Sequence, residues 1–371
     1  MTGWVEKHNG SYRYRIELNK DLITNKRKTI SKSGFKLKKD ATKALNQKLV
    51  EINDGKYIED KKISVEYFLT EWIESYKNNI APSTFKRYKE FCTSVNNHIG
   101  SIELLKLTPI IIQGLYTELL NKGLSKSTVL KVHRCLKLAL KQAVGWNMLN
   151  SNPCDNVKPP RPDKVDIQIW DESTTKRFLF LSRDEGIYIV IAIALGTGMR
   201  EGEICALKWD CVDLKNGEIY VKRSLQNIDG VLTLKEPKTK GSIRRISIAP
   251  DLVNVLKEYK KYQTEMKMLN RRNYTDDNFV CTWEDGRPYA PLYIAKKFPL
   301  LISKYNVPKI RFHDLRHTHA TILLLHDVPA KIVSERLGHS TISITLDTYS
   351  HVLPSMQRAA AEKLNGLFGA L

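Results

Sequence analysis

The chain has 371 residues, enough for two or three domains, and its 42% hydrophobic and 27% charged residues are typical of a folded globular protein. A mainly disordered chain is excluded. Its 60 Lys and Arg against 40 Asp and Glu leave a net charge of +20, which favours a polyanionic partner, nucleic acid ahead of a membrane surface. No apolar stretch approaches the roughly 20 residues that cross a bilayer, and no signal-peptide core opens the chain. We therefore expect a cytoplasmic protein without a membrane partner.

Residues 1–63 predict a small separate domain. Apolar and polar residues alternate around Asn9-Gly10, which predicts a short antiparallel sheet, and a helical pattern follows from Leu37 to Ile52. This segment holds sixteen Lys and Arg against eight Asp and Glu. Any one of these cations could belong to an ordinary solvated surface, but as a group they favour a sheet that binds DNA. The predicted contacts are Arg13, Arg15, Lys26, Arg27 and Lys28.

Residues 64–157 predict a second, all-helical domain. Apolar residues follow the 3.6-residue period, and helices are expected over Ser83–His98, Thr108–Lys122 and Ser125–Trp146. Basic residues on their outer faces are candidate DNA contacts, although each could equally be an ordinary surface cation. They are Lys86, Arg87, Lys126, Lys131 and Arg134. A proline-rich stretch at residues 158–162 then predicts a linker.

Residues 163–371 predict a third domain of mixed α+β character. Helices are expected over Asp171–Leu181, Gly186–Leu195 and Arg200–Leu207, followed by strands over Glu218–Leu225, Val231–Glu236 and Ile243–Ile248. A helical pattern resumes at Pro250 and continues through Leu315–His326, Pro329–Leu337 and Ser343–Tyr349. The fold class expected is thus multidomain: a small β-sheet plus helix, an all-α domain and a mixed α+β domain.

Four stretches of the third domain place strongly polar residues beside core-forming sequence. They are Gly196–Glu203, Pro237–Gly241, His313–His317, and Leu337–Ser340 with Tyr349 ten residues after His339. Arginines, a lysine, histidines and a tyrosine together suit attack on a phosphodiester, because guanidiniums hold the oxygens, acids and bases move protons, and a phenol attacks. Carboxylates at metal-ligand spacing are missing, so we expect neither a metal nor another cofactor.

In this order the motifs resemble those of the tyrosine recombinases, or phage integrases. Thr197–Glu203, Leu337–Ser340 and Thr345–His351 are most similar to the integrases of Gram-positive phages and conjugative transposons. The resemblance implies an arm-type DNA-binding domain, a core-binding domain and a catalytic domain with a C-terminal tail. It implies a site-specific recombinase that cleaves and rejoins DNA through a 3′-phosphotyrosine and integrates or excises a mobile element, such as a viral genome. Its implied partners are double-stranded DNA at core and arm sites, further copies in a homotetramer, an excisionase and a host DNA-bending protein.

The same resemblance implies roles for individual residues. Tyr349 is the nucleophile, and Arg200 and Arg316 clamp the scissile phosphate. His313 acts in acid–base catalysis on the Tyr349 proton, and its spacing from Arg316 puts both on one helical face. His339 donates to a nonbridging oxygen. Glu203, one helical turn beyond Arg200, is a candidate partner that orients Arg200, although it could equally be an ordinary solvated carboxylate.

The implied general-acid lysine is ambiguous. The Pro-Lys-Thr-Lys pattern points to Lys238, whereas counting back from Arg245-Ile246 points to Lys240. We favour Lys238, because a hairpin loop varies in length more readily than its strand.

Three rival interpretations fit the sequence less well. His313–His317 resembles a zinc-binding helix only superficially, because Asp replaces Glu and no third ligand is placed. A type IB topoisomerase-like enzyme shares the chemistry, but the N-terminal sheet suits an enzyme that bridges two DNA sites. A non-catalytic architectural DNA-binding protein would have no need of Tyr349 or of the two arginines, and all three are present.

Overall fold

The computed structural model describes residues 2–20, 27–53, 62–163, 168–235, 243–349 and 362. The chain divides into two compact units, Met1–Lys164 and Val165–Leu371. The bounds of the three domains inferred from the sequence stay predictions. Among the described residues, no helix is both long and apolar enough to span a membrane.

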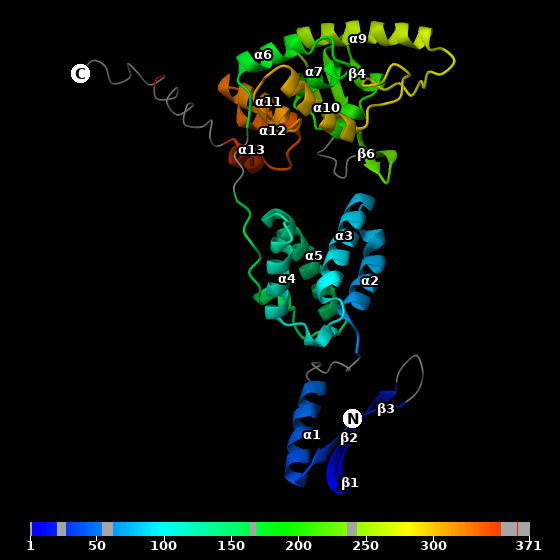
Figure 1. Ribbon diagram of the computed structural model, residues 1–371, viewed down its shortest axis with the longest axis vertical. Coiled ribbons are helices and arrows are strands. Elements are labelled where there is room, and N and C mark those ends of the chain that lie inside the picture. Colours follow the sequence, from blue (N-terminus) through cyan, green and yellow to red (C-terminus); the bar gives the residue numbers. More distant parts are fainter. Residues whose placement is uncertain are drawn as a thin grey trace, which may run out of the picture. The chain divides into compact units, whose positions relative to one another are not determined.

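The chain begins with an antiparallel sheet covered on one face by a helix (Figure 1). Its strands are β1 (Thr2–His8), β2 (Ser11–Lys20) and β3 (Arg27–Phe35), in that order, and the helix is α1 (Lys38–Asn53). Asn9 and Gly10 take positive φ angles in the two-residue turn between β1 and β2, as such hairpins require. Tyr14 and Ile16 pack with Leu45 of α1 in a small core. The intervening residues of β2 therefore face away from α1.

Helices α2 (Val65–Tyr76), α3 (Pro82–Ile99), α4 (Pro109–Asn121) and α5 (Lys126–Gly145) form the next part of the chain. Ser64 and Ser125 cap α2 and α5 by accepting backbone hydrogen bonds, and prolines open α3 and α4. The apolar face of each helix lines one core around Trp72 and Tyr116. The three helices predicted for this segment are confirmed, with each end shifted by one residue.

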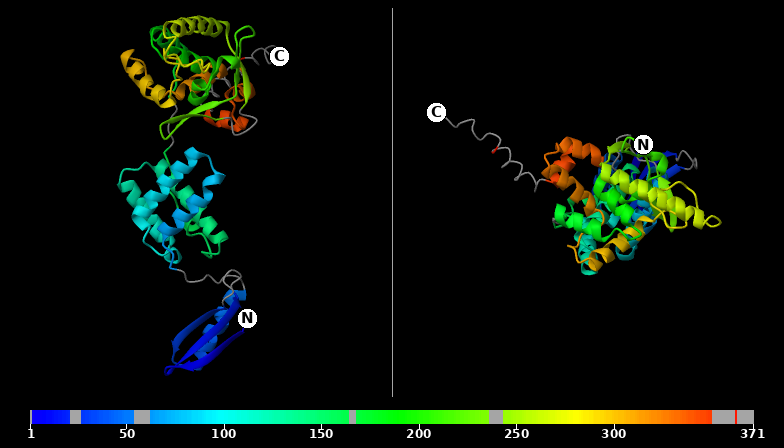
Figure 2. Two further views of the ribbon diagram at one scale, coloured as in Figure 1. Left: turned by 90° about the vertical axis from the view of Figure 1, so that its right-hand side faces the viewer. Right: turned by 90° about the horizontal axis from the view of Figure 1, so that it is seen from above.

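The second unit mixes helices with two small sheets (Figures 1 and 2). Its first helices are α6 (Glu172–Leu181), α7 (Tyr188–Thr197) and α8 (Glu201–Cys205). A three-stranded antiparallel sheet has the order β4 (Val212–Asp213), β5 (Glu218–Val221) and β8 (Arg244–Ser247), and β6 (Ser224–Ile228) pairs with β7 (Val231–Lys235) in a separate ribbon. The remaining helices are α9 (Pro250–Leu269), α10 (Pro291–Lys304), α11 (Asp314–Leu325), α12 (Ala330–Leu337) and α13 (Ile342–Thr348). The predicted fold class is confirmed.

Two details of the sequence interpretation are wrong. The single strand expected over Glu218–Leu225 is two strands in different sheets, because the chain changes partner at Lys222-Arg223 and apolar alternation does not reveal a partner. The helical pattern expected to continue from Pro250 is interrupted between α9 and α10, where isolated bridges such as Lys208 with Phe279 pin an irregular segment.

Helix α7 lies at the centre of the second unit. Residues Ile189 to Leu195 are all buried, and the helix is apolar on every side, which is the pattern of a core helix. Helix α11 packs against it. The C-terminal end of α7 is therefore held rigidly, and the polar motifs gather around that end.

Candidate active site

Arg200 stands at a sharp turn between α7 and α8. Gly198 ends α7 in the left-handed conformation (φ 67°), and a side chain there would clash with Leu337 and His319. Thr197 secures the turn, because its hydroxyl donates to the Ile193 carbonyl and accepts from the Met199 amide. The apolar sequence before this turn is buried, so Arg200 follows directly from the core.

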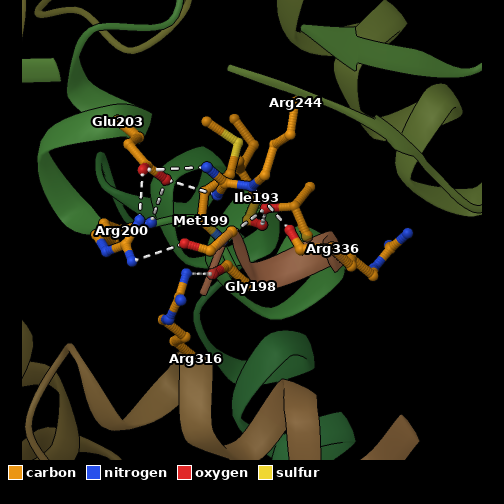
Figure 3. Close-up of polar contacts among 10 residues, drawn as sticks. Ile193, Gly198, Met199, Arg200, Glu203, Arg244, Arg316 and Arg336 are labelled. Carbon is orange, nitrogen blue, oxygen red and sulfur yellow. Dashed lines mark hydrogen bonds and ion pairs between the residues drawn. The ribbon is translucent and has the colours of Figure 1, made fainter. Parts of the chain in front are cut away.

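Glu203 lies between two arginines (Figure 3). Its carboxylate accepts hydrogen bonds from the backbone N–H of Arg200 (2.9 Å) and from its guanidinium (2.9 Å). It also accepts two from Arg244 of β8, at 3.1 and 2.7 Å. Burial alone raises the pKa of Glu203, but hydrogen bonds from Arg244 and then Arg200 outweigh it and leave that pKa lowered. Glu203 is therefore an anion that fixes both the backbone and the guanidinium of Arg200.

Arg316, on α11, is almost fully buried. Its Nη1 donates to the Gly198 carbonyl at 2.8 Å, but its Nη2 has no hydrogen-bond partner among the described residues. Desolvation, followed by the nearby Arg200 and Arg244, lowers the pKa of Arg316 to about 9. A buried donor without an acceptor costs about 1–3 kcal/mol, which an incoming anion would recover.

Tyr349 lies at the C-terminal end of α13 with its side chain buried. Its hydroxyl is hydrogen-bonded to Nδ1 of His317, at 3.0 Å, and the rings of His317 and His313 are 5.2 Å apart. Burial raises the pKa of Tyr349 to about 12, with Arg316 opposing that rise. Burial lowers the pKa of His317 to about 4, so the imidazole is neutral near pH 7 and can accept a proton.

Sequence reasoning gave no role to His317 or Arg244, although both belong to this cluster. His317 could have been found from its spacing, since it lies four residues after His313 and so on the same side of one helix. Arg244 shares the inward side of β8 with the buried Ile246. A cation on the apolar side of a strand is unusual enough to be a signal.

His339 follows Gly338, which ends α12 in the left-handed conformation (φ 68°). Its Nδ1 is hydrogen-bonded to the Thr345 hydroxyl at 2.8 Å, and the Gly338 carbonyl accepts from Arg200 at 3.3 Å. Burial, then Arg316 and Arg200, lower the pKa of His339 to about 4. The structure therefore brings His339 to the same end of α7 as the two arginines.

The cluster has the chemistry of an anion site beside a phenol. Arg200, Arg244 and Arg316 carry three positive charges, and Glu203 supplies one negative charge among them. Guanidinium donors favour phosphate, and the neutral imidazole of His317 is in hydrogen-bond contact with the Tyr349 hydroxyl, where it can accept a proton. Among the described residues, no group of three or more His, Cys, Asp or Glu side chains is placed to hold a metal ion.

The other predicted residues are placed as follows. Lys238 and Lys240 lie outside the described residues, as does Lys26. Arg27 and Lys28 belong to β3. Arg13 and Arg15 share the side of β2 that faces away from α1, and Arg13 pairs with Glu6. The remaining candidates are exposed on α3 or α5: Lys86, Arg87, Lys126, Lys131 and Arg134.

Three family models match the chain in succession. They are the Arm DNA-binding domain over residues 5–52, the phage integrase N-terminal SAM-like domain over 64–120, and the phage integrase family over 172–356. The chain belongs to the phage integrase family of tyrosine recombinases. The family resemblance drawn from the motifs is confirmed.

Two relatives of this integrase-family chain match it over nearly its whole length. It is 29% identical to a "Tyrosine recombinase XerC-like" protein of Caldanaerobacter subterraneus subsp. tengcongensis, with 99% of each chain covered. It is 27% identical to the ICEBs1 integrase of Bacillus subtilis, with 97% of this chain and 98% of the relative covered. The Tn1549 transposon integrase in complex with transposon right end DNA is similar in fold, with a TM-score of 0.71, 23% identity, and coverage of 81% of this chain and 99% of that one.

Proposed function

We propose that this integrase-family protein is a site-specific recombinase of a mobile element, which cleaves and rejoins double-stranded DNA through a 3′-phosphotyrosine at Tyr349. The observation that carries the proposal is the unpartnered Nη2 donor of Arg316, buried beside Arg200 and near the Tyr349 hydroxyl. A donor held without an acceptor in a positively charged cluster is suited to one nonbridging phosphate oxygen.

In the proposed reaction the Tyr349 oxygen attacks phosphorus and the bond to the 5′-oxygen breaks. The phenol must lose its proton to attack, and it needs a base to do so because burial raises its pKa to about 12. The proposed acid–base group is His313, and His317 is added as the imidazole in hydrogen-bond contact with the phenol. Arg200, Arg316 and His339 hold the nonbridging oxygens as charge develops there, and Glu203 orients Arg200. The 5′-oxygen leaves with a proton from a lysine, for which Lys238 remains favoured over Lys240.

The phosphotyrosyl bond keeps the energy of the phosphodiester, so a 5′-hydroxyl from a second strand can reverse the attack and rejoin the DNA. No cofactor is required by this scheme. The proposed partners are core-site DNA at α3 and α5, a separate arm site at the N-terminal sheet, and three further copies of the chain. An excisionase and a host DNA-bending protein are further proposed partners. The proposed enzyme is cytoplasmic and acts on the DNA of a phage, a transposon or a related element.

Similar proteins support this scheme. The ICEBs1 protein is an integrase, the Tn1549 integrase is bound to transposon right end DNA, and a lambda integrase tetramer is bound to a Holliday junction.

The test is Tyr349→Phe on a nicked suicide substrate that carries the core site. The phenyl ring keeps the packing and removes only the attacking oxygen, so DNA binding should stay unchanged while the covalent adduct on a denaturing gel disappears. An adduct formed by the variant would refute the assignment of Tyr349.

A further inference from the structure

Arg336 joins three elements that carry the active-site motifs, and nothing in the proposed reaction uses it. It lies in the last turn of α12, two residues before Gly338. Its Nη2 donates to the Gly196 carbonyl of α7 at 2.9 Å, and its Nη1 donates to the Ser247 carbonyl of β8 at 2.7 Å. Its Nε donates to Nε2 of His319, on α11, at 3.0 Å. The side chain thus links α12 to α7, β8 and α11 at once.

His319 extends this link into α7. Because the Arg336 Nε can only donate, Nε2 of His319 must accept, so the imidazole is neutral and carries its proton on Nδ1. That Nδ1 then donates to the Leu195 carbonyl at 2.6 Å. Burial, reinforced by Arg336, lowers the pKa of His319 to about 4, which keeps this arrangement near neutral pH.

The main chain of α12 is held by the same region. The Arg336 carbonyl accepts from Nε of Arg244 at 2.8 Å, and Arg244 holds Glu203, which holds Arg200 (Figure 3). The side chain and the carbonyl of Arg336 therefore fix α12 against both sides of the turn that carries Arg200.

We propose that Arg336 is a positioning residue for strand cleavage, which sets the turn that carries His339 against the turn that carries Arg200. This inference rests on the proposed function, since it concerns how two groups meet one phosphate. A planar guanidinium fits three acceptors in fixed directions, which a lysine ammonium on a flexible stem does not. All three acceptors are neutral, so these hydrogen bonds fix directions and do not neutralise a charge. The arrangement is useful because a misplacement of about 1 Å in a catalytic group can slow a reaction about 100-fold.

The experiment compares Arg336→Lys with wild type in the full-length protein. Three quantities are measured: the dissociation constant for core-site DNA, the single-turnover rate of adduct formation on a suicide substrate, and the melting temperature. Lysine keeps the charge but not the three directed bonds. At a temperature where both proteins are folded, we expect the dissociation constant of the variant to stay within about threefold of wild type. The rate of adduct formation should be at least about tenfold lower. Lys331→Met, which removes an exposed cation from the same helix, should leave all three unchanged.

A second variant removes one bond of the link. His319→Leu keeps an apolar volume on α11 but removes the acceptor for Arg336, so it should also slow cleavage more than binding, by less than Arg336→Lys. An unchanged cleavage rate in Arg336→Lys would overturn the inference, as would binding and cleavage that fall in the same proportion in both variants. Failure of wild type to form any adduct would instead refute the proposed function.

Discussion

Glu203→Gln tests how much the two-arginine arrangement contributes to stability. Glutamine keeps the volume of the side chain and one carbonyl acceptor, so no cavity forms. It removes the negative charge and replaces one acceptor oxygen with an amide NH₂ that faces N–H donors. The side chains of Glu203 and Arg244 are only 9% and 6% exposed, so water cannot replace the lost partner of Arg244.

The size of the effect follows from this burial. Removing one partner of a buried ion pair costs about 3–5 kcal/mol, because the other charge stays uncompensated. The retained carbonyl puts the expected loss at the lower end, about 3 kcal/mol of unfolding free energy for this part of the chain. At 1.4 kcal/mol for each factor of ten, that loss corresponds to roughly 100-fold faster amide hydrogen exchange.

Hydrogen exchange of the full-length protein, followed by mass spectrometry, measures this directly. Peptides that contain β8 should lose protection, while peptides from α5 serve as the internal reference. Glu335→Gln makes the same chemical change at an exposed position of α12 and should shift exchange by less than about threefold. Exchange of β8 within threefold of wild type in Glu203→Gln would refute the reasoning.

The pH dependence gives a second check. The pKa of Glu203 in the folded protein lies below its ordinary value of 4.5. A carboxyl group of this kind stabilises the fold above its ordinary pKa and loses that contribution as the pH falls through the lowered value. The difference between wild type and Glu203→Gln should therefore be largest at neutral pH and shrink in acid. A difference that stays constant down to the acid limit of folding would assign the effect to packing.

Two further predictions concern the general-acid lysine and the N-terminal segment. A 5′-bridging phosphorothiolate expels a sulfur leaving group that needs no proton, so it should restore cleavage by Lys238→Ala, with Lys240→Ala only mildly impaired on ordinary DNA; the opposite pattern would move the role to Lys240. Deletion of residues 1–63 should abolish the footprint on a second DNA site and recombination between paired sites but spare core-site cleavage, and footprints identical to those of the full-length protein would contradict the arm assignment.

The motif residues and the broad fold could be predicted from the sequence, because they depend on patterns among residues that are close together in the chain. Helix caps at Ser64 and Ser125, the Asn9-Gly10 turn and the glycine turn before Arg200 are all local features. The helices whose bounds were predicted therefore agree with the structure within one or two residues, whereas the pattern after Pro250 did not show where α9 ends and α10 begins.

The links between motifs were not readable, because they depend on long-range packing. Arg244 meets Glu203 across 41 residues, and Arg336 meets Gly196 across 140. The division of Glu218–Leu225 between two sheets has the same cause, since the sequence of a strand does not determine which strand it pairs with. The sequence alone identified most of the side chains that we assign to the reaction. Only the fold identified the residues that position those side chains.

The ends of two helices bear on how the positive charges of the site are tolerated. A helix carries a partial negative charge at its C-terminal end, and α7 and α12 both end here. Their last carbonyls accept hydrogen bonds from Arg200, Arg244, Arg316, His319 and Arg336. Peptide dipoles do not titrate and do not cancel a full charge. They hold the arginine side chains in place and still leave the site electropositive. A phosphate that enters it meets donors already in place, so binding does not bear the entropy cost of arranging them.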